Sequence, residues 1–377
     1  MTSPRIRTPN STFSIQTPFL LVAGARPNFM KVAPIQRALR RRKIPCKLLN
    51  TGQHHDPALS DVFLRDLGLG HPDYNLEVGS GSHAETTARI LERSEIILQK
   101  LRPRAVVVVG DVNSTLAVAL ATGKLNMPVA HVEAGLRSRD RLMPEEINRV
   151  LTDAISDLLL TPSPDADVNL KNEGIPASRI ARVGNVMIDS LMAALSRLDA
   201  GDQRPSTINH RLFFLMTFHR PSNVDTIEGL KRMAQFLGRA ARLCSVQLPL
   251  HPRTRARLRE AGLWKRFSKI PNLQILEPLG YFDFIGRMRR AKAVVTDSGG
   301  VQEETSHLGI PCLVMRTATE RPICVERGTA ELMGEDYDRA LNRLRVILRG
   351  RWKRPARIPL WDGRAAERIV SALVKRF

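Results

Sequence analysis

A Ser-Gly-Gly run followed by a glutamate carries the most explicit chemistry in this sequence. In Val295–Pro311, VTDSGGVQEETSHLGIP, an apolar strand gives way to Ser298, Gly299 and Gly300 and then to a helix. Paired glycines let the backbone approach a phosphate, and N–H groups of the next turn can donate to it. Glu304 lies one turn further on, where a carboxylate can accept hydrogen bonds from two ribose hydroxyls. The stretch predicts a nucleotide site. Glu303, next to Glu304, has no assigned role in it.

Two cations and a histidine extend this anion site. Arg26 and Lys31 flank a Pro-Asn-Phe-Met run where the first strand becomes a helix, and both suit a diphosphate near a helix N-terminus. A solvated surface lysine is the alternative for Lys31. His219 directly follows an apolar strand, where an imidazole can protonate or hold a departing phosphate oxygen. No GxGxxG or GxxxxGK[ST] run occurs here, which argues against a dinucleotide cofactor or a P-loop.

Carboxylates follow two further apolar strands. Asp111 ends AVVVVG and Glu133 ends PVAHV, and a carboxylate at the mouth of a buried sheet suits proton transfer. The alternative for Asp111 is to cap the helix near Thr115. Glu145 and Glu146 follow a proline at a helix start, where acids also complement the helix dipole. No cluster has convincing metal-ligand spacing, so we expect no metal.

The elements that position these residues alternate between strand and helix. Strands are expected at 19–23, 47–50, 105–110, 129–133 and 158–161, with helices at 31–41, 83–100, 115–125 and 145–156. After the polar segment 196–210, strands are expected at 212–217, 246–250, 273–276, 293–296 and 311–315. This alternation predicts two successive parallel sheets covered by helices. Since ligands bind beyond the carboxyl ends of such strands, the polar clusters predict one site between two domains.

Composition narrows the class of protein. The formal charge of +21 favours anionic partners, but aromatic residues, 5% of the chain, do not interleave with the basic runs as in nucleic-acid sites. We therefore expect a solvated basic face and no nucleic-acid partner. The four dispersed cysteines fit reduced thiols in a cytoplasm. The apolar runs are too short to span a membrane.

A series of segments resembles the non-hydrolysing UDP-N-acetylglucosamine 2-epimerases in order and spacing. They lie between about Leu20 and Gly334 and read GARPNFMKVAPI, NTGQHHD, GDVNST, HVEAGLRS, MPEEINR, VGNVMID, HRPSNVD, TDSGGVQEET and TERPICVERGT. The resemblance implies an α/β fold of GT-B type, with two doubly wound Rossmann-like domains and an interdomain active-site cleft. It also implies a homodimer that needs no cofactor. The EAGLR run favours the non-hydrolysing branch.

The family's chemistry inverts C2 of a UDP-sugar. UDP is eliminated across C1–C2 to give a 2-acetamidoglucal and re-adds after C2 is reprotonated on the other face. The resemblance places Asp111, Glu133, Glu145 and His219 at catalytic positions, and it leaves open which carboxylate takes the C2 proton. It places the following at UDP-sugar-binding positions: Arg26, Lys31, Leu279, Phe284, Ser298, Gly299, Gly300, Glu304 and Arg321.

The resulting expectations are specific. We expect a disordered leader (1–18), an N-terminal Rossmann-like domain (19–190), a UDP-binding Rossmann-like domain (191–360) and a C-terminal helix that packs back on the first domain (361–377). The expected function is epimerisation of UDP-N-acetylglucosamine to UDP-N-acetylmannosamine for cell-surface polysaccharide. The alternatives are a related UDP-2-acetamido sugar as substrate, or a GT-B glycosyltransferase. The positive charge suggests weak peripheral contact with anionic membrane.

Overall fold

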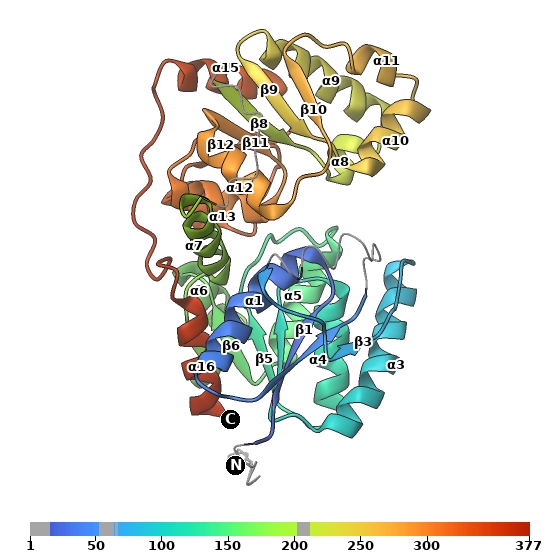
Figure 1. Cartoon of the computed structure of the whole chain (residues 1–377), viewed down its shortest axis with the longest axis vertical. Helices are drawn as coiled ribbons and strands as arrows, with labels where there is room; N and C mark the ends of the chain where they lie inside the picture. Colours follow the sequence, from blue (N-terminus) through green and yellow to red (C-terminus); the bar gives the residue numbers. More distant parts are fainter. Residues whose placement is uncertain (1–15, 53–63, 65–66, 202–211) are drawn as a thin grey trace.

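Two parallel sheets, each flanked by helices, make up the protein. The structure, a computed structural model, describes residues 16–52, 64, 67–201 and 212–377, without the side chains of Arg26, Pro221 and Ser222. Most of the expected leader lies outside the described residues. The two sheets belong to two lobes, one above the other in Figure 1. The expected α/β class with two doubly wound domains is confirmed.

The first sheet has seven strands in the order β3-β2-β1-β4-β5-β6-β7. They are β1 (Phe19–Ala23), β2 (Cys46–Asn50), β3 (Tyr74–Asn75), β4 (Val106–Val109), β5 (Val129–Val132), β6 (Leu158–Thr161) and β7 (Ile180–Arg182). The helices of this half are α1 (Arg26–Arg41), α3 (His83–Leu101), α4 (Asn113–Lys124), α5 (Pro144–Ile155), α6 (Pro164–Asn172) and α7 (Val186–Asp199). The central strands are buried along their whole length and are apolar except for His131 and Thr161. The strand order reverses between β1 and β4, where a ligand site is expected.

The second sheet repeats this plan with six strands in the order β10-β9-β8-β11-β12-β13. They are β8 (Phe213–Thr217), β9 (Ser245–Pro249), β10 (Leu273–Leu276), β11 (Ala293–Thr296), β12 (Cys312–Val314) and β13 (Ala330–Leu332). Its helices are α8 (Pro221–Val224), α9 (Ile227–Ala241), α10 (Pro252–Glu260), α11 (Trp264–Phe267), α12 (Tyr281–Arg290), α13 (Gly299–Leu308), α14 (Pro322–Glu326) and α15 (Tyr337–Leu348). Its switch point lies between β8 and β11.

All ten strands expected from the sequence are present, and their ends differ from the expected ones by at most one residue. The sequence reasoning missed β3, β7 and β13. These strands have two or three residues and lie at sheet edges. So short a strand has no room for the alternation that identifies strands.

Gly24, directly after β1, lies where there is no room for a side chain. A Cβ at this position would lie 2.1 Å from Ser114 Oγ and 2.5 Å from Thr51 Oγ1. Those two hydroxyls are hydrogen-bonded at 2.7 Å. Only glycine therefore lets β1 end against the start of α4, which sets the position of everything that follows β1.

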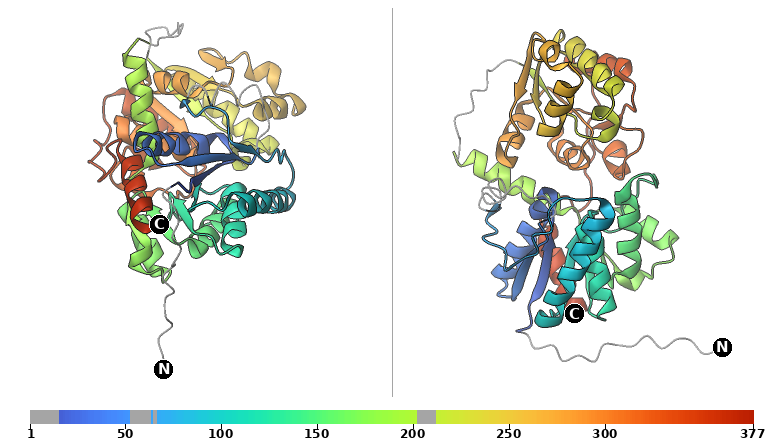
Figure 2. Two further views of the ribbon diagram at one scale, coloured as in Figure 1. Left: turned by 60° about the horizontal axis from the view of Figure 1, so that its bottom comes forward. Right: turned by 90° about the vertical axis from the view of Figure 1, so that its right-hand side faces the viewer.

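The last helix, α16 (Ala365–Arg376), returns to the first lobe. It packs against α1 and α7, and α7 also contacts α12 and α13 of the second lobe (Figure 2). Asp189 of α7 accepts hydrogen bonds from the backbone N–H groups of Ala365 and Ala366, at 3.0 and 2.7 Å. A side chain from another helix thus caps α16. The expected domain boundary at residue 190 falls inside α7, which both lobes share.

Asp189→Ala is expected to loosen α16. Losing two hydrogen bonds to a buried carboxylate should lower the free energy of unfolding by about 1–3 kcal/mol, measured in urea, and hydrogen exchange in α16 should accelerate. The control Asp199→Ala removes an exposed ion pair with Arg289 from the same helix and should cost less than about 1 kcal/mol. Unchanged exchange in α16 of Asp189→Ala would contradict the capping role.

Candidate functional site

The carboxyl ends of the central strands bring Lys31, Asp111 and Glu133 together. Lys31, in the second turn of α1, forms an ion pair with Glu133, and both side chains are buried. Gly110 lies beside this pair, since a Cβ there would be 3.0 Å from Lys31 Nζ and 3.4 Å from Glu133 Oε2. A buried, paired ammonium is not a surface lysine, so the solvated alternative for Lys31 is wrong.

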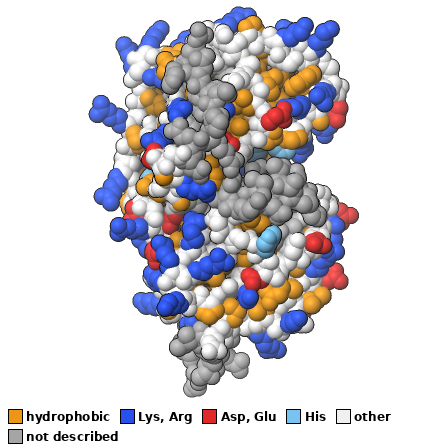
Figure 3. Space-filling view, in the orientation of Figure 1, with side chains coloured by type: hydrophobic (Ala, Val, Ile, Leu, Met, Phe, Trp, Pro, Cys, Tyr) orange, Lys and Arg blue, Asp and Glu red, His pale blue; other side chains and the backbone are white. Residues whose placement is uncertain are grey.

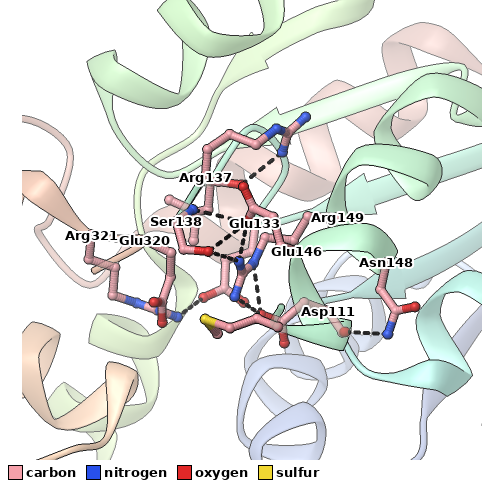
Figure 4. A network of polar contacts seen from close by, with 12 residues as sticks. Asp111, Glu133, Arg137, Ser138, Glu146, Asn148, Arg149, Glu320 and Arg321 are labelled. Carbon is pink, nitrogen blue, oxygen red and sulfur yellow. Dashed lines mark hydrogen bonds and ion pairs between the residues drawn. The ribbon is translucent and has the colours of Figure 1, made fainter. Parts of the chain in front are cut away.

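Arg149 of α5 holds Asp111 by its carboxylate. The Arg149 Nε and Nη2 atoms lie 2.9 and 2.7 Å from Asp111 Oδ2 (Figure 4). Desolvation raises the pKa of Asp111, but Arg149 and Lys31 outweigh it, so the pKa lies below its ordinary value. Asp111 is therefore ionised at neutral pH. The capping alternative is wrong, because Val112 occupies the cap position of α4 and Asp111 instead pairs with Arg149.

Glu146, the neighbour of the predicted Glu145, fixes the other end of Arg149. Its carboxylate pairs with Arg149 Nη1 and accepts the backbone N–H groups of Ser138 (2.9 Å) and Arg139 (2.8 Å). Desolvation raises the pKa of Glu146, but these N–H groups and Arg149 hold it below its ordinary value. Glu146 therefore ties the loop after Glu133 to the helix that orients Asp111.

Glu133 lies between two cations from different lobes. One carboxylate oxygen pairs with Lys31, and the other lies 2.7 Å from Arg321 Nη2. Arg321 directly precedes α14, so this ion pair joins the second lobe to the first. Glu133 has a φ of 73°, a left-handed conformation that is uncommon for a residue other than glycine. Such strain persists only where its surroundings enforce it, and here the two ion pairs do so.

Arg321 also lies against the N-terminus of α13. A Cβ on Gly299 would be 2.6 Å from Arg321 Nη1 and 2.5 Å from Glu320 Oε1, so a larger residue here would displace the ends of both side chains. The guanidinium forms ion pairs with Glu133, Glu320 and Glu303, the last with Nε and Oε1 2.7 Å apart. The first N–H groups of a helix lack intrahelical acceptors. Guanidinium and N–H groups therefore meet at one point, and both favour an anion.

Glu303 and Glu304 are both buried in α13. Glu303, which had no assigned role, pairs with Arg321. Burial raises the pKa of Glu303 to about 7, although Arg321 opposes it, and raises that of Glu304 to about 8. Within the described residues, Glu303 Oε2 and Glu304 Oε1 have no hydrogen-bond partner. Buried oxygens of this kind need donors, and the hydroxyls of a ligand are suitable ones.

His219 follows β8, and Asp297 follows the neighbouring strand β11. His219 Nδ1 lies 2.7 Å from Asp297 Oδ1, and Asp297 also accepts from the backbone N–H groups of His219 and Arg220. Desolvation raises the pKa of Asp297, but these partners hold it below its ordinary value. The His219 side chain is 49% exposed whereas Asp297 is fully buried. The carboxylate orients a ring whose Nε2 has no partner among the described side chains.

Three further predicted residues lie in or directly before α5 and α12. Glu145 is half-buried in the first turn of α5, and α5 begins beside the second lobe, since Arg316 Nη2 lies 3.8 Å from Met143 Sδ. Leu279 precedes α12 and Phe284 lies within it, both half-buried. The side chain of Arg26 is outside the described set.

Three important residues escaped the sequence reasoning: Arg149, Asp297 and Glu320. Asp297 had a signal, because it directly follows a strand next to the one that precedes His219. Arg149 had a weaker one, three residues after Glu146 on the same helix face. Glu320 had none, since its partners Arg316 and Arg321 lie in one irregular segment.

Within 16–52, 67–201 and 212–377, no group of three or more His, Cys, Asp or Glu side chains is placed to hold a metal ion. No helix in these ranges is long and apolar enough to cross a membrane.

Fold and site together define a class, an α/β protein of GT-B type with a cluster of buried ion pairs where its two domains meet. At the level of the fold, a lipopolysaccharide outer core galactosyltransferase superposes with a TM-score of 0.50 at 14% identity. A family model described as UDP-N-acetylglucosamine 2-epimerase matches residues 37–374. The chain therefore belongs to this family of epimerases.

Individual relatives agree. The chain is 39% identical to a UDP-N-acetylglucosamine 2-epimerase of Methanocaldococcus jannaschii, over 94% of this chain and 98% of the relative. A crystal structure of the Methanocaldococcus enzyme in complex with UDP-GlcNAc and UDP superposes with a TM-score of 0.87, covering 95% and 99% of the two chains. The chain is also 39% identical to a UDP-2,3-diacetamido-2,3-dideoxy-D-glucuronate 2-epimerase of Pseudomonas aeruginosa, over 94% and 99%.

Arg149→Met is expected to lower kcat about a hundredfold, because Asp111 loses the group that orients it, while UDP binding changes little. The pKa of Asp111 should rise without its cation, so the acid limb of the pH–rate profile should move to higher pH. Lys124→Met, at an exposed position in the last turn of α4, is the control. An unchanged profile would show that Arg149 does not govern Asp111.

Proposed function

We propose that the chain catalyses non-hydrolysing C2 epimerisation of UDP-N-acetylglucosamine to UDP-N-acetylmannosamine. The observation that carries this proposal is the contact of Arg321 with both Glu133 and the N-terminus of α13. It brings a diphosphate-type anion site from the second domain against carboxylates of the first. Proton transfer at C2 and departure of UDP from C1 require these two groups side by side.

In the proposed reaction, a carboxylate among Asp111, Glu133 and Glu145 removes the C2 proton. The C1–O bond to UDP breaks as the C1=C2 double bond forms, which leaves a 2-acetamidoglucal. A proton is then delivered to the opposite face of C2, and the UDP oxygen re-adds to C1. Because the UDP leaving group gains negative charge, cations beside it lower the barrier, and Lys31 and Arg321 are placed for that role. His219, held by Asp297, serves as acid for the leaving oxygen.

The nucleotide is assigned to the second domain. Ser298, Gly299 and Gly300 hold the diphosphate at the start of α13, and Glu304 accepts the ribose hydroxyls. Arg26 and the pocket around Leu279 and Phe284 complete this assignment, as the sequence resemblance implies. The buried Glu304 Oε1, which has no hydrogen-bond partner in the described part of the chain, supports the ribose assignment.

A related UDP-2-acetamido sugar is the second candidate substrate. It is favoured by the equal identity, 39%, to the Methanocaldococcus enzyme and to the diacetamido-glucuronate epimerase of Pseudomonas. A GT-B glycosyltransferase is disfavoured. Such an enzyme must bind an acceptor, and that task does not require the carboxylates that face Arg321.

We further propose a homodimer through the outer face of α5. This helix is amphipathic, but its polar face points into the protein and its aliphatic face points outward. Its buried residues are all polar (Glu146, Asn148, Arg149, Thr152 and Asp153), and its outer face exposes Ile147, Val150, Leu151 and Ile155. A stripe of this kind marks an interaction surface.

A second copy of the chain is the occupant that this face fits. Leu142, 94% exposed, projects just before α5. A hollow of about 300 Å³ lies along the helix, lined by Ile147, Val150 and Leu151 together with Arg137, Arg139 and Arg141. A projection and a hollow on one face meet the requirement of a two-fold interface, in which each copy supplies both.

We place the enzyme in the cytoplasm and its product in cell-surface polysaccharide synthesis, since both follow from the expected use of a UDP-sugar. Contact with anionic membrane stays a prediction from the net charge. Lys and Arg side chains are spread over both lobes on the face in Figure 3 rather than gathered in one patch, and cosedimentation with acidic vesicles would measure such contact.

Incubation with UDP-N-acetylglucosamine in D2O is expected to give deuterium at C2 and UDP-N-acetylmannosamine, both visible by NMR. Run over a panel of UDP-2-acetamido sugars, the same experiment ranks the candidate substrates. UDP release that depends on an acceptor sugar, without deuterium at C2, would instead identify a glycosyltransferase.

The double variant Val150→Asp/Leu151→Asp is expected to sediment as a monomer, because two carboxylates would have to be desolvated at the interface. The unchanged enzyme should sediment at twice its chain mass of 42.1 kDa. Ile227→Asp, at an aliphatic residue 51% exposed on α9, is the control and should stay dimeric. A double variant that remains dimeric would place the interface elsewhere.

A further inference from the structure

Arg321, beside the N-terminus of α13, is shared by several carboxylates. The guanidinium of Arg321 faces three buried carboxylates, Glu133, Glu303 and Glu320. Two of these, Glu133 and Glu320, also pair with a second cation. Glu303 has no second ion pair among the described residues, and its Oε2 has no hydrogen-bond partner there. Glu303 is therefore the carboxylate that depends most on Arg321.

A diphosphate bound at this helix N-terminus competes with the carboxylates for Arg321. It adds at least two negative charges beside Arg321, and guanidinium donors that turn toward it must leave a carboxylate. Glu303 then loses its counterion while it stays buried. A buried carboxylate without a counterion is more stable neutral than charged, so Glu303 takes up a proton.

The same ligand has the opposite effect on Glu304. Glu304 is buried, and its Oε1 has no hydrogen-bond partner among the described residues, which favours the neutral acid. Two ribose hydroxyls that donate to this carboxylate favour its ionised form. Nucleotide binding therefore removes the proton from Glu304.

The groups that face these two carboxylates come from several elements. Around Glu303 they are Arg321 and Cys324 at α14, Lys31 of α1, Glu133 after β5, and Glu304. Around Glu304 they are Tyr281 of α12 and Glu303. Burial raises the pKa of Glu303 to about 7, with Arg321 and Lys31 acting against it and Glu133 with it. Burial also raises the pKa of Glu304 to about 8, with Tyr281 acting against it and Glu303 with it.

We propose that Glu303 and Glu304 share one proton, which resides on Glu304 in the empty site and on Glu303 when a nucleoside diphosphate is bound. The inference rests on the proposed nucleotide site. Glu303 is then a positioning residue: it holds Arg321 toward Glu133 in the empty site and releases it by becoming neutral. The proton exchanges through solvent, and the pair keeps the same total charge before and after binding.

Calorimetric titration with UDP at about pH 7.5, in buffers of different ionisation enthalpy, counts the protons that move on binding. Relative to the unchanged enzyme, Glu304→Gln should take up roughly 0.5–1 proton more per UDP, because only Glu303 still responds. Glu303→Gln should take up roughly 0.5–1 proton fewer, because only Glu304 responds. The double variant should match the unchanged enzyme, as should Glu326→Gln, an exposed glutamate of α14.

The pH dependence of UDP affinity gives an independent readout. Proton uptake makes binding weaker as pH rises, so affinity of Glu304→Gln should fall by up to about tenfold per pH unit above pH 7, relative to the unchanged enzyme. Proton release has the opposite sign, so affinity of Glu303→Gln should rise with pH up to about 8 on the same scale. If Glu303→Gln does not fold, as judged by circular dichroism, the slope of Glu304→Gln decides.

Equal proton counts in the unchanged enzyme and both single variants would overturn the shared proton, as would shifts of the same sign. A double variant that differs from the unchanged enzyme would place the proton on another group. If the unchanged enzyme does not bind UDP, the nucleotide site fails, and this inference fails with it. Binding of UDP without the opposite shifts would defeat the inference alone.

Discussion

The ion pair between Arg321 and Glu133 is the interaction on which the rest of the site depends. It is buried, joins the two domains, and belongs to a network in which every cation serves at least one carboxylate. Removing one member of such a network leaves an uncompensated charge in the interior, which costs several kcal/mol. That cost explains why the strained backbone of Glu133, the glycine at 299 and the buried carboxylate of Glu303 occur together. Each makes sense only with the guanidinium in place.

Helix α5 shows how the site and the surface constrain each other. Its inner face is polar because it must hold Asp111 and the loop after Glu133, so it cannot contribute an apolar stripe to the core. The aliphatic residues that a helix of this length needs to bury are on the outside instead. The face of α5 that would normally pack in the core supplies polar groups to the site, and the aliphatic residues therefore lie on the exposed face.

The fold was predictable because its signals are local. Buried parallel strands are apolar runs, and the polar residues that follow them mark the carboxyl ends, so both sheets and the junction could be placed from the sequence. The edge strands escaped because they are too short to carry a pattern. In the site, Lys31, Asp111, Glu133 and Gly299 lie where strand ends predicted them. The partners that orient them did not follow from the sequence, because an ion pair such as Arg149–Asp111 joins residues 38 positions apart and depends on the angle between a helix and a strand.

The cap that Asp189 places on α16 also sets an order of events during synthesis. The two backbone groups that it accepts lie 176 and 177 positions further along the chain. At roughly 5–20 residues per second, the ribosome needs on the order of ten seconds or more to reach them. Throughout that time α1 lacks the helix that packs against it in the folded protein. The amino-terminal domain, though made first, therefore cannot complete its packing until the second domain has been synthesised.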